Sequence, residues 1–502
     1  MTTTSDLLGR GFLPKELPPP FGSETLGAAV ASAKIPPTFG STATRLCKHN
    51  VARLGGLRRV VGIPNPTTHF KLCQEVEAHW HEIEVQLDKS SISTSKPQIG
   101  SVKGRAVFSK PPDLAPLRAK CRSTARFVLK ADISRFYYSI YTHSIPWAFH
   151  GKQYAKANKF TKDLGNQLDK YVRNTQDMQT MGIPVGPDTS LIIAEALLGT
   201  VDEILADRLP GLRALRYWDD YEFCFNSRVE AEKAMSVIQE VLSEYELALN
   251  PEKTEIFELP ISIDTPWVAP LRQFRFRRKA ASQSRDLVSY FDLATSLHSM
   301  YPRRGVFGYA IGRLRGIKLH RSSWGIFQDL LLQCLRAEPG VSPTVYELIR
   351  FYYELGWEIN NEQFTEVLNN HIREHAPLGQ ASEVAWAIWM LIAYELDLDS
   401  SSSQVVGQMQ DSVVALLALD ARDKGLVPSG LPTSTWQDYM TTEELFGDQW
   451  LLSYEASIKG WMRSVGTKDH VRADPQFAAL KKAGVSFYDS SRKLTTVSAP
   501  EY

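Results

Sequence analysis

Residues 212–225 read LRALRYWDDYEFCF, and two adjacent acids, Asp219 and Asp220, stand in the middle of this apolar and aromatic run. Strands are depleted in Asp, and burial of a carboxylate is costly unless a partner compensates for its lost hydration. The apolar stretches on both sides of the acids predict a pair of strands, with the acids at the tip of a hairpin. Two carboxylates at such a tip indicate a site that needs negative charge.

A third acid, Asp132, ends a second predicted strand in the stretch ARFVLKADI at residues 125–133. If the two strands are neighbours in one sheet, Asp132 and Asp219 converge, and the repulsion between them would raise one pKa. Divalent cations remove this conflict. Two Mg²⁺ ions about 3.5–4 Å apart, bridged by such carboxylates, activate an attacking hydroxyl and stabilise a leaving pyrophosphate. The acids therefore predict nucleotidyl transfer.

The composition restricts the other possibilities. The chain has 502 residues, of which 43% are hydrophobic and 23% charged, and its net charge of +1 requires any nucleic acid to bind a local basic surface. Five cysteines without CxxC spacing argue against a disulfide framework or a zinc site and suit a reducing cytoplasm. No apolar run approaches the roughly 18 residues of a membrane span, and the start lacks a secretory core. We therefore predict a cytoplasmic protein without a membrane partner.

Periodicity predicts an α+β part followed by an all-α part. Residues 1–40, with three successive prolines in ELPPPF, are predicted to form an extended arm over another surface. Between about residues 125 and 260, short apolar runs alternate with helical stretches, which is an α+β pattern. Residues 266–502 are predicted to form a HEAT-like array of stacked helices that ends in an irregular tail.

Charge is unevenly distributed, because residues 45–130 are rich in Lys and Arg whereas residues 382–450 are acidic. The basic part is either a surface that binds a polyanion or an ordinary solvated face.

Between the acid-bearing strands lies MGIPVGPDTSLIIAEALL, residues 181–198, in which Gly182, Gly186 and Pro187 precede an apolar helix. Glycine allows close approach of a ligand to the backbone, and the N–H groups at a helix N-terminus favour anions. An ordinary loop that enters a helix has the same pattern.

The order of these segments resembles that of a reverse transcriptase. The boxes that carry the resemblance are RRVVGIPNP (58–66, before the fingers), ADISRFYYSI (131–140, motif A), GIPVGPDTS (182–190, motif B), YWDD (217–220, motif C) and LNPEKT (249–254, motif D). Three further stretches resemble a narrower group, the bacterial abortive-infection (Abi) and defence-associated reverse transcriptases. They are GRGFLPKELPPPF (9–21), AEALL (194–198) and SEVAWAIW (382–389). The resemblance implies reverse-transcriptase-like fingers and palm over residues 41–265.

The resemblance also implies roles for the acids and for one aromatic residue. Asp132 and Asp219 would ligate two Mg²⁺ ions, with Mn²⁺ as the alternative, and Asp220 would support them. Tyr137 matches the aromatic steric gate that selects deoxynucleotides, although a plain core aromatic would fit there too, as Phe136 and Tyr138 do.

Other positions would bind the nucleotide. Lys253 matches the motif D lysine that protonates or neutralises pyrophosphate, although an exposed lysine at a helix end would read the same. Gly186 and Pro187 would approach the substrate. Candidates for a triphosphate clamp in the fingers are Lys120, Arg122 and Arg126.

Three departures weaken the case for ordinary copying of RNA. Val185 stands where templated enzymes usually carry Gln, Trp218 replaces a smaller residue of the YxDD box, and no thumb of usual length follows motif D. The Abi relatives are known for protein-primed, template-independent DNA synthesis by homo-oligomers in which helical domains help enclose the product.

The predicted function is therefore a metal-dependent DNA polymerase of antiphage defence that uses dNTPs and makes DNA without a template. The DNA would be attached to a Tyr or Ser hydroxyl of the homo-oligomeric protein. Two alternatives stay open at this stage: an RNA-templated reverse transcriptase, and an inactive palm that serves as a scaffold for the helical array.

Overall fold

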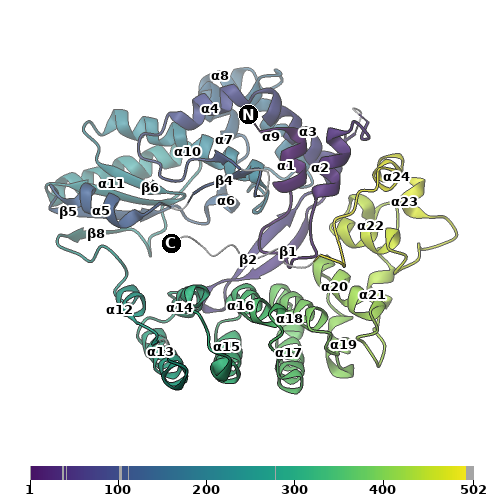
Figure 1. Cartoon of the computed structure of the whole chain (residues 1–502). Helices are drawn as coiled ribbons and strands as arrows, with labels where there is room; N and C mark the ends of the chain where they lie inside the picture. Colours follow the sequence, from purple (N-terminus) through teal and green to yellow (C-terminus); the bar gives the residue numbers. More distant parts are fainter. Residues whose placement is uncertain are drawn as a thin grey trace.

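The computed structural model describes residues 2–36, 39–40, 42–100, 104–110, 112–277 and 279–492. Figure 1 shows a sheet-bearing part above, a row of helices below, and a long β-hairpin that crosses between them. The irregular tail predicted at the C-terminus ends in residues 493–502, which lie outside the described residues, and the stretch before them contains two short helices, α23 (His470–Ala473) and α24 (Pro475–Lys482). The domain boundaries drawn from the sequence stay predictions.

A four-stranded antiparallel sheet carries the three acids. Its strand order is β6 (Ala214–Tyr217), β7 (Asp220–Phe225), β5 (Phe127–Asp132) and β8 (Glu255–Glu258). The central strand β5 pairs with β7 on one side and with β8 on the other. The predicted hairpin around the two acids and the predicted strand that ends at Asp132 are thus both present, as neighbours in one sheet.

Helices pack around this sheet. α11 (Arg228–Glu244) contacts β5 and β7, and α10 (Asp188–Arg208) packs against α11. α11 begins with a capping box in which the Ser227 side chain and the Glu230 side chain each accept a backbone N–H of the first turn. The remaining elements of this part are α3 (Pro66–Ala78), α4 (Trp80–Asp88), β3 (Gln98–Ile99), β4 (Val107–Phe108), α5 (Leu114–Arg122), α6 (Phe136–Ser139), α7 (Ser144–His150), α8 (Lys152–Ala157) and α9 (Leu164–Asn174).

The hairpin of β1 (Cys47–Ala52) and β2 (Arg58–Ile63), which are joined by η1 (Leu54–Gly56), is fastened to the C-terminal helices. The buried His49 Nδ1 lies 2.9 Å from Asp411 Oδ2. Arg58 pairs with the buried Glu383, with 2.6 Å between its Nη2 and Oε2. The hairpin therefore joins the sheet-bearing part to the helical part.

The C-terminal part is helical, and in Figure 1 α12 to α19 lie below the hairpin whereas α22, α23 and α24 lie to its right. Adjacent helices contact one another, as in the pairs α13 with α15, α16 with α18 and α17 with α18. Their identification as HEAT-like repeats stays a prediction. The elements are α12 (Val268–Gln273), α13 (Ala280–Met300), α14 (Val306–Arg313), η2 (Leu314–Gly316), η3 (Arg321–Ser323), α15 (Trp324–Ala337), η4 (Pro339–Val341), α16 (Ser342–Glu354), α17 (Asn361–His375), η5 (Ala376–Leu378), α18 (Ala381–Ala393), α19 (Ser400–Val406), α20 (Ser412–Asp423), α21 (Ser434–Gln437), η6 (Glu444–Phe446), α22 (Trp450–Ile458), α23 (His470–Ala473) and α24 (Pro475–Lys482).

The prediction of an extended N-terminal arm is wrong for two stretches, α1 (Thr4–Arg10) and α2 (Glu24–Ala31). The two helices cross closely, since a Cβ added to Gly27 would lie 2.6 Å from the Cα of Gly9. Small residues at a crossing let helix backbones pack, and this contact stabilises helices too short to form alone. The three prolines of ELPPPF, which lie between the two helices, led to the prediction of an extended arm.

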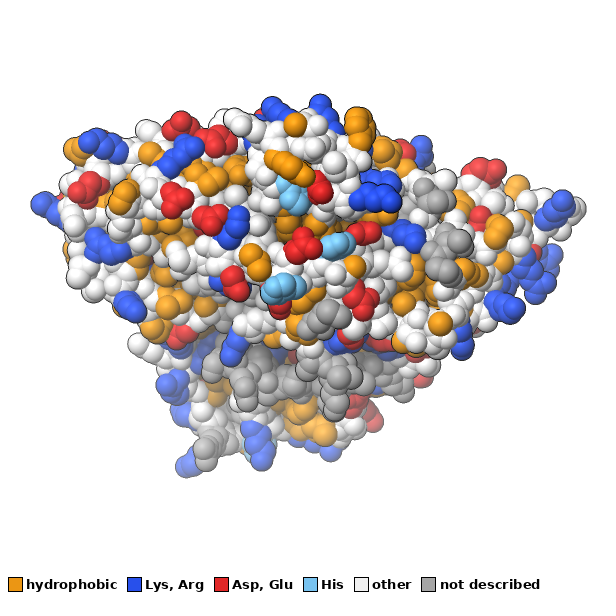
Figure 2. Space-filling model, turned by 90° about the horizontal axis from the view of Figure 1, so that it is seen from above, with side chains coloured by type: hydrophobic (Ala, Val, Ile, Leu, Met, Phe, Trp, Pro, Cys, Tyr) orange, Lys and Arg blue, Asp and Glu red, His pale blue; other side chains and the backbone are white. Residues whose placement is uncertain are grey.

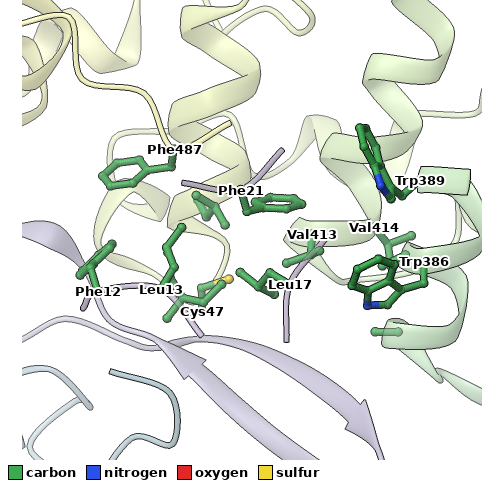
Figure 3. Close-up of a cluster of buried hydrophobic side chains, with 14 of the residues drawn as sticks. Phe12, Leu13, Leu17, Phe21, Cys47, Trp386, Trp389, Val413, Val414 and Phe487 are labelled. Carbon is green, nitrogen blue, oxygen red and sulfur yellow. The ribbon is translucent and has the colours of Figure 1, made fainter. Parts of the chain in front are cut away.

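The segment between α1 and α2 does cover another part of the chain. In Figure 3 its side chains Phe12, Leu13, Leu17 and Phe21 lie among buried residues of the C-terminal helices. Phe12 contacts Phe487 with 5.6 Å between ring centroids. The two ends of the described chain therefore share one core.

Within this core, Glu455 of α22 is fully buried and accepts hydrogen bonds from Phe487 N at 2.6 Å and Ser486 Oγ at 3.0 Å. Burial raises the pKa of Glu455 to about 7, so its protonated form is favoured in the fold. Stability should therefore be highest below the pKa of an unfolded Glu and fall as pH rises through 7.

We expect Glu455→Gln, which stays neutral, to unfold at nearly the wild-type temperature at pH 5 and at a higher temperature at pH 8. At pH 8 the free energy of unfolding of the variant should exceed that of the wild type by on the order of 3 kcal/mol. Thermal unfolding followed by circular dichroism at both pH values checks this. An equal effect of the substitution at the two pH values would contradict it.

Figure 2 shows the molecule from above, and on this face Lys and Arg side chains are interspersed with Asp and Glu. Several cations of the basic stretch 45–130 are paired with acids, for example Arg45 with Asp177 at 3.4 Å. No helix in the described part of the chain has the length and apolarity that a membrane span requires.

Candidate active site

The two-residue turn between β6 and β7 consists of Trp218 and Asp219, because Tyr217 and Asp220 pair with each other. Trp218 has a φ of +56°, which is uncommon for a bulky residue and needs support from its surroundings. Its N–H donates to Ser95 Oγ at 2.8 Å, and its carbonyl accepts from Arg216 Nη1 at 2.9 Å. These two bonds hold the turn.

The structure brings Asp132, Asp219 and Asp220 together. Asp132 and Asp220 are register partners on β5 and β7, and the Asp219 carbonyl accepts from Ile133 N at 3.1 Å. Burial raises the pKa of Asp219, and the charge of Asp132 raises it further. Loss of hydration raises the pKa of Asp220 to about 7, helped by its hydrogen bond with Asp132 and the charge of Asp219. The carboxylates of Asp219 and Asp220 therefore lack enough nearby positive charge to stabilise their ionised forms.

Two residues of the stretch LNPEKT contact the most buried acid. Lys253 Nζ donates to Asp132 Oδ2 at 2.6 Å, and Asn250 Nδ2 donates to Asp132 Oδ1 at 3.1 Å. Burial lowers the pKa of Lys253, but the hydrogen bond and the charge of Asp132 outweigh it, so the pKa is raised. Asn250 was not singled out from the sequence, although it lies in the same box as Lys253.

The acids fit a divalent metal whose ligand shell the substrate completes. Carboxylates are the hard oxygen donors that Mg²⁺ prefers, and the raised pKa values of Asp219 and Asp220 show that a cation would be stabilised here. Within the described ranges, no group of three or more His, Cys, Asp or Glu side chains is arranged so that it could hold a metal ion by itself. Mg²⁺ usually takes one or two carboxylates together with substrate phosphates, so this arrangement suits a nucleotide complex.

Tyr137 lies between the acids and the loop before α10. Its carbonyl accepts from Ile183 N at 2.8 Å. Burial raises the pKa of the Tyr137 hydroxyl, and the charges of Glu195 and Asp219 raise it further. Phe136 is a core side chain, 4% exposed, and the Tyr138 hydroxyl donates to Val60 O at 2.7 Å. Of the two tyrosines, Tyr137 is therefore the one whose hydroxyl is near enough to Asp219 for the charge of that acid to raise its pKa.

The loop before α10 is covered by the segment that follows α1. A Cβ added to Gly186 would lie 2.6 Å from Pro14 Cγ, and Pro187 is buried. Asp188 N donates to Gly11 O at 2.8 Å. The segment after α1 therefore covers the N-terminus of α10 at Gly186. This cover disfavours a role in substrate binding for Gly186 and Pro187, which stays a prediction.

Two of the three residues predicted for a triphosphate clamp are paired with acids. The Arg122 side chain is buried and pairs with Glu222 at 2.6 Å, and the exposed Arg126 pairs with Glu258 at 3.0 Å. Lys120 is exposed on α5. Arg126 precedes β5, which ends at Asp132, so roughly 16 Å of strand lies between these two residues. Arg122 lies closer to the acids, because its partner Glu222 pairs with Lys130, two residues before Asp132, but this ion pair occupies its guanidinium group.

Arg59 of β2 is the cation that the sequence reasoning missed. Its charge lowers the pKa of Asp219, which places it near the acids. Its side chain forms no hydrogen bond or ion pair with any residue in the described ranges, whereas that of its neighbour Arg58 pairs with Glu383. The stretch RRVVGIPNP carried the signal, but the sequence did not tell which of the two arginines would be engaged.

A buried ionic network lies behind the turn. Arg216, with 0% side-chain exposure, donates to both oxygens of Glu195 at 2.9 and 3.1 Å, and its Nε donates to Asp202 at 2.8 Å. Ser95, which accepts from Trp218, donates in turn to Glu195 Oε1 at 3.0 Å. Glu195, which lies in the stretch AEALL, thus accepts hydrogen bonds from both Arg216 and Ser95, the two residues that fix the turn.

Comparison with known proteins supports the resemblance over part of the chain. Residues 60–284 match the family model described as "Reverse transcriptase (RNA-dependent DNA polymerase)". No curated protein sequence matches the chain significantly.

Among solved structures, the chain is similar to apo telomerase from Candida tropicalis, with a TM-score of 0.35 at 11% identity over 78% of this chain and 72% of that chain. Telomerase from Candida albicans in complex with a fragment of telomeric RNA gives a TM-score of 0.30 at 11% identity, over 78% and 65%. The same complex from Candida tropicalis gives 0.29 at 12% identity, over 79% and 68%.

Proposed function

We propose that this nucleotidyltransferase, whose residues 60–284 form a reverse-transcriptase domain, is a metal-dependent DNA polymerase that extends a protein hydroxyl without a template. The observation that carries the proposal is the meeting of Asp132, Asp219 and Asp220 at one end of the sheet, with Lys253 on Asp132. An inactive palm is disfavoured, because a scaffold gains nothing from carboxylates that repel one another.

Each of these residues has a separate role in the proposed nucleotide transfer. Asp132 and Asp219 would hold two Mg²⁺ ions, which supply Lewis acidity to the attacking hydroxyl and to the α-phosphate. Asn250 fixes the Asp132 carboxylate through Oδ1. Lys253, with a side chain 56% exposed, can turn from Asp132 toward the departing pyrophosphate and neutralise it or give it a proton. The new bond joins the hydroxyl oxygen to the α-phosphorus as pyrophosphate leaves.

We expect Tyr137→Ala to reduce discrimination against ribonucleotides by about a hundredfold, because the ring would no longer exclude a 2′-hydroxyl. Incorporation of dNTPs and NTPs in parallel reactions gives the ratio. Tyr137→Phe keeps the ring and should keep the selection. An unchanged ratio in the Ala variant would remove Tyr137 from the role of gate.

We expect Arg59→Ala to raise the KM for dNTP by about 10–100-fold with a smaller change in kcat, since a charged hydrogen bond to phosphate contributes about 1.5–3 kcal/mol. Arg126→Ala is the matched control, because Arg126 is an exposed arginine at the other end of β5. Steady-state kinetics with varied dNTP measures both variants. Equal KM values in the two variants would exclude Arg59 from triphosphate binding.

The surroundings of motif B support synthesis without a template. Val185 stands where templated enzymes usually carry Gln, its carbonyl accepts from Gly62 N at 2.9 Å, and the adjacent Gly186 is covered by Pro14. The description of the matching family as RNA-dependent favours the alternative, an RNA-templated enzyme.

Labelled dNTP incubated with the full chain and Mg²⁺ tests priming and templating together. Protein priming predicts label that stays on the protein band after denaturing electrophoresis and leaves it on nuclease digestion. Addition of RNAs of different sequence should not change the sequence of the product. Label only in free DNA contradicts protein priming, and a product complementary to the added RNA contradicts untemplated synthesis.

The role in antiphage defence is supported by the resemblance of GRGFLPKELPPPF, AEALL and SEVAWAIW to the Abi enzymes. The resemblance also suggests a homo-oligomer, which light scattering of the purified chain would test. Bacteria that express the chain should resist phage, and bacteria that express the Asp132→Asn variant should not. Equal plaque counts on the two strains would contradict the defence role.

A further inference from the structure

Two of the five cysteines lie together. All five are free thiols, yet Cys121 Sγ of α5 and Cys224 Sγ of β7 are only 2.7 Å apart, although 103 residues separate them in the chain. Cys121 is partly exposed and Cys224 is buried. The remaining three, Cys47, Cys73 and Cys334, are all buried.

Neighbouring contacts fix this approach of α5 to β7. Glu222 and Cys224 are two residues apart on β7 and so lie on the same face of the sheet. Glu222 binds Arg122 at 2.6 Å and Arg118 at 3.2 Å, both from α5. Two ion pairs with the same helix therefore hold the thiols in place.

We propose that Cys121 and Cys224 are a redox modification site that forms a reversible disulfide by exchange with a small dialkyl disulfide such as glutathione disulfide. Such pairs in a reducing compartment usually sense redox state and do not serve as structural links. The absence of CxxC spacing does not exclude this pair, because the fold and not the sequence brings the thiols together.

The exchange has two steps. The Cys121 thiolate attacks one sulfur of glutathione disulfide, which forms a mixed disulfide and releases one glutathione thiolate. Cys224 then loses its proton and displaces the second glutathione. Two protein thiols are oxidised and one small disulfide is reduced to two thiols, so electrons and protons balance.

The two thiols are suited to these different roles. The hydrogen bond with Cys224 lowers the pKa of the Cys121 thiol, although burial opposes this. Cys121 is also the more accessible of the two, so an external disulfide meets it first. Cys224 then needs to reach only the sulfur beside it.

The full chain is equilibrated with glutathione disulfide or with dithiothreitol, and its thiols are then counted after denaturation. The titre should fall from five to three on oxidation, with a mass loss of about 2 Da and a Cys121–Cys224 peptide in the digest. Closure of so long a loop should raise the unfolding midpoint of the oxidised chain by several degrees.

Cys334→Ala is the control, because it removes a buried cysteine of the helical part and should leave the loss of two thiols unchanged. Cys121→Ala, at a partly exposed position, should keep the far-ultraviolet spectrum and lose no thiol. A wild-type titre that stays at five, a bond between other cysteines, or a stable mixed disulfide on Cys121 would each overturn the proposal.

Discussion

Asp219→Asn should lower nucleotide incorporation by at least about a thousandfold without unfolding the protein. The substitution keeps the shape of the side chain and removes one charge from the pair that would hold the metal ions, which costs several kcal/mol of transition-state stabilisation. The fold should tolerate it, because burial and the charge of Asp132 already raise the pKa of Asp219. Neutralisation therefore relieves repulsion.

Single-turnover incorporation and thermal unfolding should be measured on the same preparations. Asp207→Asn is the control, because Asp207 is an exposed aspartate on α10. It should change neither quantity. Activity of the Asp219 variant within about tenfold of the wild type would remove Asp219 from the catalytic pair.

Glu195→Ala should lower the free energy of unfolding by about 3–5 kcal/mol, because it leaves the buried Arg216 without one of its two carboxylate partners. The turn at Trp218 should loosen as well, since both of its anchors, Arg216 and Ser95, are bonded to Glu195. Glu195→Gln keeps one acceptor and should lose less. Denaturant unfolding and incorporation at varied Mg²⁺ would check both variants.

Glu203→Ala is the matched control on the same helix. Glu203 pairs with Lys89 at 3.0 Å on the surface, where such a pair contributes at most about 1 kcal/mol. If Glu195→Ala cost no more than Glu203→Ala, the buried network would have no structural role. A normal Mg²⁺ requirement in a destabilised Glu195→Ala variant would deny it a role in positioning the acids.

Local patterns in the sequence were enough to predict three of the four strands of the sheet, β6, β7 and β5, together with the acids that they carry. Apolar runs of strand length end at Asp132 and flank Asp219, and strand pairing then places these residues side by side. Lys253 was singled out because the stretch LNPEKT resembles motif D, and in the structure its Nζ donates to Asp132 Oδ2.

Contacts between distant segments could not be predicted in this way. Gly186 looked open to a ligand, but Pro14, more than 170 residues earlier, covers it. Arg122 looked available for phosphate, but Glu222 on another strand pairs with it. The sequence did not show that Arg58 and Arg59 differ in their partners. In the structure, Glu383 of the helical part pairs with Arg58. In each case the competing partner is fixed by tertiary packing, which periodicity does not record.

Anomalous diffraction from a crystal of the full chain with Mn²⁺ and a non-hydrolysable dNTP analogue tests the central claim most directly. We expect two manganese peaks about 3.5–4 Å apart between the carboxylates of Asp132 and Asp219, with the triphosphate completing their coordination. Peaks at other side chains, or a bound nucleotide with no metal between these two acids, would contradict the account.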